Sequence, residues 1–475
     1  ARHLATRPTA WLALASGWPF ARETVDKAYR LKAHLILPEP NGASTGPSAF
    51  NNRLGSPACD DQWHWDGARE HAAAMLTDEA VHMLRFPTPD ELTNALAVRT
   101  QIFDSHLYGN LRNAPYKHPD GKRYDAQGKG RYLENDELRG HAWVWRIFPN
   151  GFNYPIEVNP GYDFYLPGAC AHIKKLQGQK SPFLMSPYLR GGTFVTNFGN
   201  AFVAVRQEAF AAIIHTGPVG SQDPNDGLVQ YKGPMGFGGG QLAAFWTPQA
   251  GSLILGRRRG MSFDKSFDNP AEWRSWPIHA VSGVTADGKL LTSARIARPD
   301  VSIETGKKRS QIKVGGTITP VTTGTVQNLE GRIDYSRLFE IDAKGITVET
   351  SISGDGKDRV TELYETIPLY LDEHRRGKDI APAVVVVEFQ VGKKWLGPTN
   401  IATPKVKAMR VKRRDGAMLV TFDTPCTVQL APVEWKDTFL TKATCRTVLV
   451  DLLGDAARPA PVPTVKLRYA IAPLP

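Results

Sequence analysis

The sequence predicts an α+β protein of more than one domain, with a helical N-terminal domain over residues 1–188 and a large antiparallel β-sandwich over residues 189–475. Three observations support this prediction. Apolar residues recur at helical spacing before residue 188, and they recur at period two after it. The chain has 475 residues, which is enough for two or three domains.

The composition indicates a folded chain without a membrane-spanning helix. Apolar residues make up 41% and charged residues 22% of the chain, a balance too apolar for a disordered protein. No stretch approaches the ~18 consecutive apolar residues that a membrane-spanning helix needs. The 58 Lys and Arg residues exceed the 47 Asp and Glu residues, and the resulting net charge of +11 favours an anionic partner.

Two helices are expected in the N-terminal region, over residues 69–84 and 90–107. Pro87 and Pro89 interrupt the helical spacing between them and predict a turn. Long loops rich in glycine, proline or aromatic residues lie around these helices, at 38–66, 110–131 and 148–168. Loops of ~20 residues inside a compact domain are usually functional, so we expect a helical scaffold that displays functional loops.

Short strands separated by turn residues are expected throughout the second region. The strongest period-two segments are 193–205, 211–215, 252–255, 311–314, 345–352, 383–391, 408–412, 418–422 and 465–470. Clusters of Gly, Asp and Pro such as Asp355-Gly356 mark turns between them. The simplest arrangement is a large antiparallel sandwich, which could divide into two sub-domains near residues 370–380.

The chain begins at Ala1 without an initiator methionine, so we expect either a processed form or a fragment. Its four cysteines show no zinc-ligand spacing. Cys426 and Cys445 could form one disulfide, and Cys59 and Cys170 could form another. An even number of cysteines fits an oxidising compartment.

A helical N-terminal region followed by a long antiparallel sandwich resembles the polysaccharide lyases built from an (α/α) toroid and a β-sandwich, the heparinase II/III, chondroitin and alginate lyase group. The resemblance is architectural and covers most of the chain. It implies that residues 1–188 are a partial α/α toroid that lacks its first helices. It also implies a secreted or periplasmic lyase that cleaves a uronate-containing polysaccharide by β-elimination.

β-Elimination needs a group that neutralises the uronate carboxylate, a base and an acid. The first long loop offers Asn52 and Arg53 for the first role and His64 for proton transfer. Trp63 and Trp65 flank this histidine and could stack on the apolar faces of sugar rings. The alternative is structural, because Asn and Arg in such loops also satisfy turn backbones and cap helices.

Two further residues of the N-terminal region are candidates. The resemblance implies a tyrosine acid on the helical domain; Tyr154 in the segment GFNYP is the choice by loop position, and Tyr162 or Tyr116 could take its place. Trp143 belongs to the same aromatic cluster and is a candidate for substrate binding. The alternative is again structural, because aromatic residues at this density commonly build a core or a domain interface.

The strand region contributes a second set of candidates. His215 ends an apolar strand and resembles the histidine that heparinase-like sandwiches direct at their cleft, whereas the alternative is a hydrogen-bonded strand-end histidine. Trp246 follows a glycine run that ends at Gly240 and is a candidate for substrate binding. No Lys-Ser/Thr follows these glycines, which argues against a nucleotide site and favours close approach of a strand or loop.

Two basic segments could hold carboxylates or sulfates. Arg257 and Arg258 lie in a compact turn after an apolar strand, and arginine binds such anions through two parallel hydrogen bonds. Arg410, Lys412 and Arg414 alternate along one strand, where a solvated face is expected. We therefore assign substrate binding to the turn.

The predicted function is a polysaccharide lyase acting on an anionic polysaccharide. The alternatives are a glycoside hydrolase, for which Asp60, Asp61 or Asp66 would supply carboxylates, and a non-catalytic carbohydrate-binding or adhesion protein. We expect no nucleic-acid partner, because the basic residues are spread out and no recognised motif occurs. We also expect no membrane insertion and no cofactor. His279 and His374 lack partners at ligand spacing, and a structural divalent metal stays open.

Overall fold

The computed structural model describes residues 187–189 and 191–474, except for 218–237, 257–269, 297–298, 307, 321–327, 372–383, 399–400 and 437–443, together with positions 34, 37, 38, 40, 44 and 45. The chain divides into two compact units. One unit comprises Ala1–His34 and Asp60–Arg190, and the other comprises Leu35–Cys59 and Gly191–Pro475. The second unit contains all the strands of the described residues, and these strands are described below.

The expected α+β fold class with a helical, toroid-like domain is wrong. The elements of the described residues are strands and two short 3-10 helices, η7 (Pro270–Ser275) and η8 (Ser293–Arg295), with no α-helix among them. The helices expected over 69–84 and 90–107 lie outside the described residues. Apolar spacing alone suggested those helices, and most helical stability comes from tertiary packing, which spacing does not report. No helix in this part of the chain is long and apolar enough to cross a membrane.

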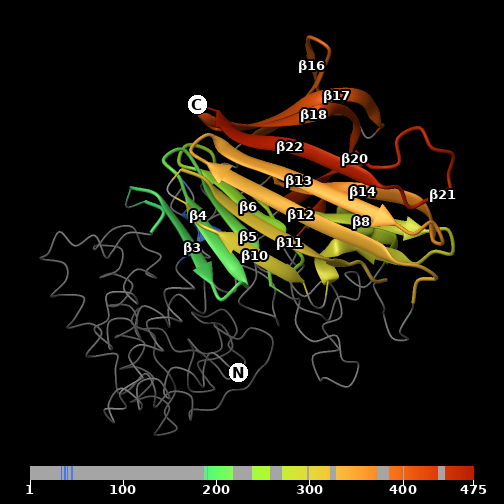
Figure 1. Cartoon of the computed structure of the whole chain (residues 1–475). Helices are drawn as coiled ribbons and strands as arrows, with labels where there is room; N and C mark the ends of the chain where they lie inside the picture. Colours follow the sequence, from blue (N-terminus) through green and yellow to red (C-terminus); the bar gives the residue numbers. More distant parts are fainter. Residues whose placement is uncertain are drawn as a thin grey trace, which may run out of the picture. The chain divides into compact units, whose positions relative to one another are not determined.

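Nine strands form an antiparallel sheet that we call the outer sheet (Figure 1). Its order is β10-β11-β12-β13-β22-β18-β17-β15-β16. The bounds are β10 Asp300–Glu304, β11 Ser310–Thr317, β12 Ile333–Asp342, β13 Gly345–Gly354, β15 Val385–Val391, β16 Lys394–Leu396, β17 Thr403–Arg413, β18 Gly416–Leu430 and β22 Val465–Leu474. β10 lies at one edge of this sheet, and β15 with β16 lies at the other.

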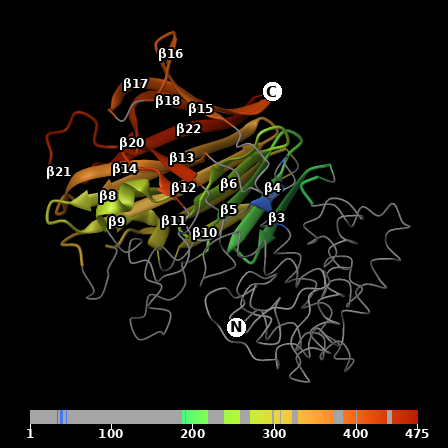
Figure 2. The same cartoon turned by 180° about the vertical axis from the view of Figure 1, so that it is seen from behind.

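The remaining large set of strands forms the inner sheet, which is seen from behind in Figure 2. β3 to β7 pair in sequence order, and β14 connects β7, β8, β20 and β21. The bounds are β3 Phe194–Phe198, β4 Phe202–Arg206, β5 Ala211–His215, β6 Gln241–Thr247, β7 Gly251–Leu255, β8 Ala280–Thr285, β9 Leu290–Thr292, β14 Arg359–Tyr370, β19 Trp435–Lys436, β20 Thr444–Asp451 and β21 Ala460–Pro461. A separate pair consists of β1 Leu37–Pro38 and β2 Ser44–Thr45.

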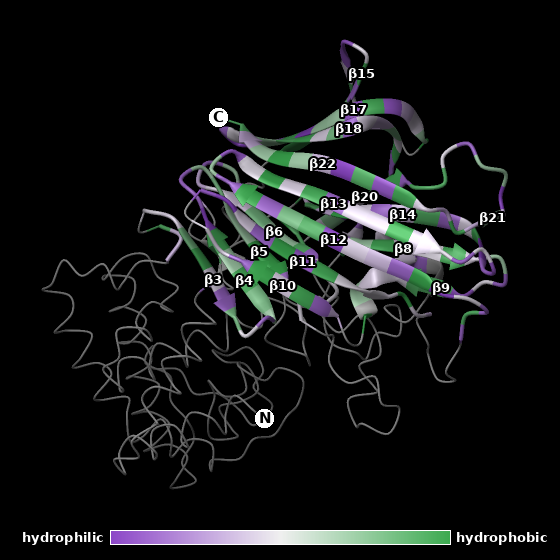
Figure 3. Ribbon diagram, in the orientation of Figure 1, coloured by the Kyte–Doolittle hydropathy of each residue, from purple (hydrophilic) through white to green (hydrophobic). Residues whose placement is uncertain are grey.

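The two sheets differ in how they are buried. Positions along β12 alternate between buried and partly or fully exposed, so the outer sheet has one core face and one solvent face. Figure 3 shows this alternation as bands of hydrophobic and hydrophilic residues along the outer strands. β5 and β6 are buried at every position. The main hydrophobic core lies between the sheets, and a smaller cluster around Trp273 and Trp276 packs on Tyr364 of β14 and Leu449 of β20.

β18 joins the two sheets into one sandwich. Its first part pairs with β22 of the outer sheet, and its last part pairs with β20 of the inner sheet. The register of β18 against β17 shifts between these two parts, as expected where a bulge bends a strand. The core is therefore closed on this side by a strand that belongs to both layers.

Most strand segments expected from period two coincide with strands of the structure; residues 211–215 match β5 residue for residue. Residues 193–205 instead form a hairpin of β3 and β4. The last strand pair is Phe198 with Phe202, so residues 199–201 form a three-residue loop, in which Gly199 and Asn200 have positive φ angles of 61° and 55°. The Asn197 amide side chain supports this turn by a 2.7 Å hydrogen bond to the Asn200 side chain.

Candidate functional site

Two of the residues predicted to form a site, His215 and Trp246, lie within the described residues. The others lie outside them: Asn52, Arg53, Trp63, Trp65, His64, Trp143, Tyr154, Arg257 and Arg258. The structure therefore does not bring this predicted set together as one constellation.

His215 and Trp246 lie on neighbouring strands but at opposite ends of their pairing. His215 of β5 is opposite Gln241, and Trp246 of β6 is opposite Ala211. Four residues along β5 separate these two pairs, which corresponds to about 13 Å. The two side chains thus occupy different regions of the inner sheet.

Both of these side chains are buried. His215 is 8% exposed, and its ring stacks on Phe202 with 4.2 Å between the ring centroids. Burial lowers the pKa of His215 to about 3, so the imidazole is neutral at pH 7. Trp246 is 1% exposed, and the Arg206 guanidinium carbon lies 5.8 Å from the indole centroid. The catalytic role of His215 and the substrate-binding role of Trp246 stay predictions.

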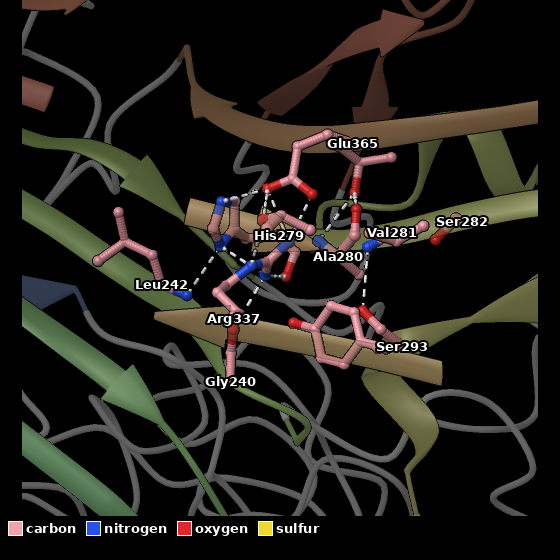
Figure 4. A network of polar contacts seen from close by, with 12 residues as sticks. Gly240, Leu242, His279, Ala280, Val281, Ser282, Ser293, Arg337 and Glu365 are labelled. Atoms are coloured by element: carbon pink, nitrogen blue, oxygen red, sulfur yellow. Dashed lines mark hydrogen bonds and ion pairs between the residues drawn. The ribbon is translucent and has the colours of Figure 1, made fainter. Parts of the chain in front are cut away.

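The largest group of titratable side chains in the described part of the chain is a buried polar network between the two sheets (Figure 4). Arg337 of β12 donates to both carboxylate oxygens of Glu365 of β14, each at 2.6 Å. Tyr469 of β22 donates to Glu365 at 2.7 Å, and its hydroxyl lies 2.6 Å from Nε2 of His279. The sequence predictions did not include Arg337, Glu365 or Tyr469.

The hydrogen bonds of His279 define its tautomer. The backbone N–H of Leu242 donates to Nδ1 at 3.0 Å, so Nδ1 carries no proton. Nε2 therefore carries the proton and donates to Tyr469. Burial and, after it, the nearby charge of Arg337 lower the pKa of His279 to about 4. Burial by itself would raise the pKa of Glu365, but Arg337 more than compensates and keeps this carboxylate ionised.

This buried network connects the layers and is closed to ligands. Arg337 also donates to the Gly240 carbonyl at 2.9 Å, and the Tyr335 hydroxyl donates to the Gly239 carbonyl at 2.9 Å. His279, Arg337, Glu365 and Tyr469 are each 0% exposed. Because no substrate can touch them in this structure, we assign the network to the folding of the sandwich. It holds the glycine segment before β6 against the outer sheet.

A second cluster of charged side chains is exposed to solvent, in contrast to the buried network. We call residues 384–415, which contain β15, β16 and β17, the basic arm. This segment has eight Lys or Arg residues and two carboxylates, so its net charge is +6, against +11 for the whole chain. Figure 1 shows the hairpin of β15 and β16 projecting from the edge of the outer sheet. The exposed lysines are Lys393, Lys394, Lys405 and Lys407.

Local backbone geometry places these lysines at the surface. Gly392, with φ of 60°, opens the tight turn between β15 and β16, so Lys393 and Lys394 lie at the hairpin tip. The register of β17 shifts on both sides of Val406. Lys405 takes φ of 57° in this irregular segment. Such bulges re-aim side chains, which accounts for the exposure of Lys405 and Lys407.

One acidic side chain lies between two cations on the solvent face of the arm. Arg410 Nε donates to Glu388 at 2.9 Å, and Lys412 Nζ lies 3.3 Å from the same carboxylate oxygen. The hydrogen bond from Arg410 lowers the pKa of Glu388. The Arg410 guanidinium carbon also lies 4.4 Å from the ring centroid of Trp395, within cation–π range. The structure places Arg410 and Lys412 partly exposed on the solvent face, as expected, whereas Arg414 lies beyond the end of β17, in the turn before β18, with φ of 54°.

Exposed apolar side chains accompany the charges of the basic arm. Val384 is 78% exposed, Ile401 76%, and Leu396 and Val386 42% each. These four are a majority of the large exposed apolar residues in the described part of the chain. The arm thus combines cations with apolar surface, a combination that suits a ligand bearing anionic groups on an apolar framework.

The described residues contain no group of three or more His, Cys, Asp or Glu side chains arranged to hold a metal ion. No disulfide joins Cys426 and Cys445, so the pairing considered between them is wrong. Cys445 of β20 pairs with Tyr370 of β14, whereas Cys426 of β18 pairs with Val406 of β17. Different neighbouring strands therefore hold the two thiols apart. Cys59 and Cys170 lie outside the described residues.

No family model matches the sequence, and no curated protein matches it. Among solved structures, a galactose mutarotase-like protein from Clostridium acetobutylicum aligns with 60% of this chain and 98% of its own, at 8% identity and a TM-score of 0.31. Galactose 1-epimerase from Lactobacillus acidophilus aligns with 59% of this chain and 98% of its own, at 8% identity and a TM-score of 0.33. The 4-alpha-glucanotransferase from Thermococcus litoralis aligns with 88% of this chain and 50% of its own, at 9% identity and a TM-score of 0.34.

These likenesses are too weak to carry any argument about fold or activity. The structure itself corrects the resemblance stated from the sequence, because the described residues contain no toroid helix. Membership of the toroid lyases, and with it the β-elimination activity, is therefore wrong. The physical reason is that the resemblance was inferred from the order of two local patterns, without the packing that distinguishes one β-rich architecture from another.

Proposed function

We propose that this protein binds an anionic polysaccharide through its basic arm. The observation that carries the proposal is the concentration of charge: residues 384–415 have a net charge of +6, and seven of their eight cations, all but the buried Arg413, are partly or fully exposed. The arm is a projecting hairpin and its neighbouring strand, without an enclosing pocket. Cations spread over such a surface can contact several anionic groups of one extended polymer, which raises affinity without new kinds of contact.

The apolar residues of the arm favour a polysaccharide over other polyanions. A sugar ring carries C–H faces beside its carboxylate or sulfate groups, and the exposed Leu396 and Ile401 offer surface for them. Binding of single-stranded nucleic acid usually needs several aromatic side chains on which successive bases stack. Within the arm, Trp395 supplies one indole, and Arg410 already lies on its face. A partner of this class fits a secreted or periplasmic location, which is part of the proposal.

The test compares two charge-matched double variants. Lys393→Gln with Lys394→Gln removes two cations from the tip of the arm. Lys344→Gln with Lys357→Gln removes two exposed cations from turns elsewhere on the outer sheet. Binding to heparin, polygalacturonate and neutral dextran would be measured by isothermal titration calorimetry at two salt concentrations.

The arm variant should bind both anionic polymers about 2- to 30-fold more weakly, since each exposed ion pair contributes about 0.2–1 kcal/mol. The control variant should stay within about twofold of the wild type. Added salt should weaken binding, because exposed charges are screened beyond about 8–10 Å. Equal losses of affinity in both variants would show that only the net charge of the protein matters. That result would contradict the proposal. Tighter binding of oligonucleotides than of both anionic polymers would assign the arm to nucleic acid.

A further inference from the structure

A polar groove of about 630 Å³ lies on the outer sheet, at the edge formed by β10 and β11. This volume is in the range of ligand sites, which is about 300–1,000 Å³. Strand order places it at the opposite edge of the outer sheet from the basic arm. Its lining residues come from β10, β11 and the start of β12, with Arg332 at the rim.

The register of the strands explains why the sheet is hollow here. Gly315 of β11 is directly opposite Asp300 of β10 and Ser336 of β12. Lys313 and Thr317 lie two residues away along β11 and point to the same side. Directly opposite residues in such a sheet have Cβ atoms about 4.5–5.5 Å apart. Gly315, which has no side chain, is thus surrounded by polar residues, and its backbone forms the floor of the groove.

The charges around this floor are balanced. Asp300 and Asp334 supply carboxylates, and Lys313 and Arg332 supply cations. Asp334 accepts a 2.7 Å hydrogen bond from Arg332, whereas the side chains of Asp300 and Lys313 make no ion pair with another described residue. The groove therefore presents acceptors and donors side by side without a net charge. An anionic ligand gains nothing overall from such a site, but a ligand whose groups both donate and accept can use every side chain.

We propose that this groove binds a neutral sugar unit through its hydroxyl groups. A carboxylate such as Asp300 accepts hydrogen bonds from two adjacent hydroxyls, and Lys313 donates to their oxygens. Gly315 allows the ring to approach the backbone. The site is independent of the basic arm, and it would let one outer sheet contact an anionic and a neutral part of a glycan at its two edges.

The test fills the groove above Gly315 and leaves the rest of β11 unchanged. Gly315→Gln places a flexible side chain over the floor. A Cβ there would lie 3.3 Å from the Tyr335 carbonyl oxygen and 3.7 Å from Ser336 Cβ, so a shift of a few tenths of an ångström accommodates it. The matched control is Ala343→Gln, at an exposed turn residue of the outer sheet that lies outside both the groove and the basic arm. Asp300→Asn is a second variant, which keeps the volume and removes the charge.

Binding of neutral hexasaccharides of glucose, galactose and mannose would be followed by saturation-transfer-difference NMR with the full chain. At least one hexasaccharide should bind to the wild type and to Ala343→Gln. Gly315→Gln should weaken it about tenfold or more, and Asp300→Asn by less, as expected for loss of one or two hydrogen bonds. No binding of any hexasaccharide, or equal binding to Gly315→Gln in a folded protein, would overturn the proposal. Loss of heparin binding in Lys393→Gln/Lys394→Gln with retained hexasaccharide binding would separate the groove from the arm.

Discussion

Two arginine–glutamate pairs lie in opposite surroundings in this protein. Arg337 and Glu365 connect the outer and inner sheets and are both 0% exposed. Arg410 and Glu388 are directly opposite on two strands of the basic arm, with side chains 25% and 22% exposed. The two pairs use the same chemical groups at similar distances, 2.6 Å and 2.8 Å.

The comparison shows that burial decides what such a pair contributes. Removing one partner of a buried pair leaves a charge with no water to solvate it, so the remaining charge strongly destabilises the folded protein. At the surface, water and ions replace the lost partner, and the pair adds little to stability. The buried pair therefore specifies how the layers fit, whereas the exposed pair shapes the charge that the arm presents to solvent.

The largest expected effect comes from removing one carboxylate from each pair. Glu365→Ala should lower the free energy of unfolding by about 3–5 kcal/mol, and Glu388→Ala should lower it by about 1 kcal/mol or less. Urea unfolding followed by tryptophan fluorescence measures both. The double variant Arg337→Met/Glu365→Leu should recover part of the loss, because it leaves no unpaired charge. Equal losses in the two single variants would show that burial does not separate the pairs.

Acid should act on the buried network and leave the arm unchanged. His279 has its pKa lowered from 6.5 to about 4 in the folded protein, so the unfolded chain binds its proton first as the pH falls. Stability is therefore fully present above about pH 6.5 and is lost toward pH 4, with about 3 kcal/mol from this residue. His279→Gln should make stability fall less steeply over this interval; buried His215, whose pKa is lowered to about 3, accounts for loss that remains.

Binding of heparin by the arm should be steady between pH 6.5 and 5. Lysine and arginine stay charged in this interval, and the pKa of Glu388 is lowered, so its carboxylate stays ionised. Parallel loss of stability and of heparin affinity, measured at a temperature where the protein stays folded, would contradict a separation between the two regions.

Two glycines with similar φ angles provide a further comparison of the buried network with the basic arm. Gly239, beside the buried network, has φ of 67°, and Gly392 in the arm has φ of 60°. A Cβ on Gly239 would lie 2.0 Å from the Ser293 carbonyl oxygen, whereas a Cβ on Gly392 meets nothing within 4 Å. Gly392→Ala should cost about 1–2 kcal/mol from the left-handed backbone alone. Gly239→Ala should cost about 1–3 kcal/mol more, because overpacking is added. Similar thermal midpoints for both variants would be inconsistent with this difference.

The smallest expected effect is a gain of binding in the arm. Glu388→Gln removes the carboxylate that lies between Arg410 and Lys412 and leaves both cations available. Affinity for heparin should rise about two- to fivefold, the equivalent of one exposed ion pair. Isothermal titration calorimetry measures this change, and Glu340→Gln, on the same face of the outer sheet, is the control. A fall in affinity would mean that Glu388 orients the cations instead of competing for them.

Local patterns in the sequence were sufficient to predict most of the strands, but they were insufficient to predict the candidate site. The segment AAIIH predicted β5 in full, because a short apolar run with β-branched residues indicates a buried strand within a few positions. The hairpin at Gly199 and Asn200 was missed although both residues favour left-handed backbone, because the flanking apolar run continued through them. Arg410 and Lys412 were correctly expected on a solvated face, but their place in a larger basic arm was not.

By itself, the sequence determined where the chain extends and turns, because side-chain alternation and turn residues act locally. Only the tertiary structure decided which charges are buried. Arg337 has a place in the strand IDYSRLFEID like that of any cation on a period-two segment, and its 0% exposure follows from the packing of β12 against β14. Glu365 lies 28 residues away and meets Arg337 only when the two sheets close. The physical reason is that the environment of a charge, which sets its pKa and its energetic role, depends on distant segments that no local pattern records.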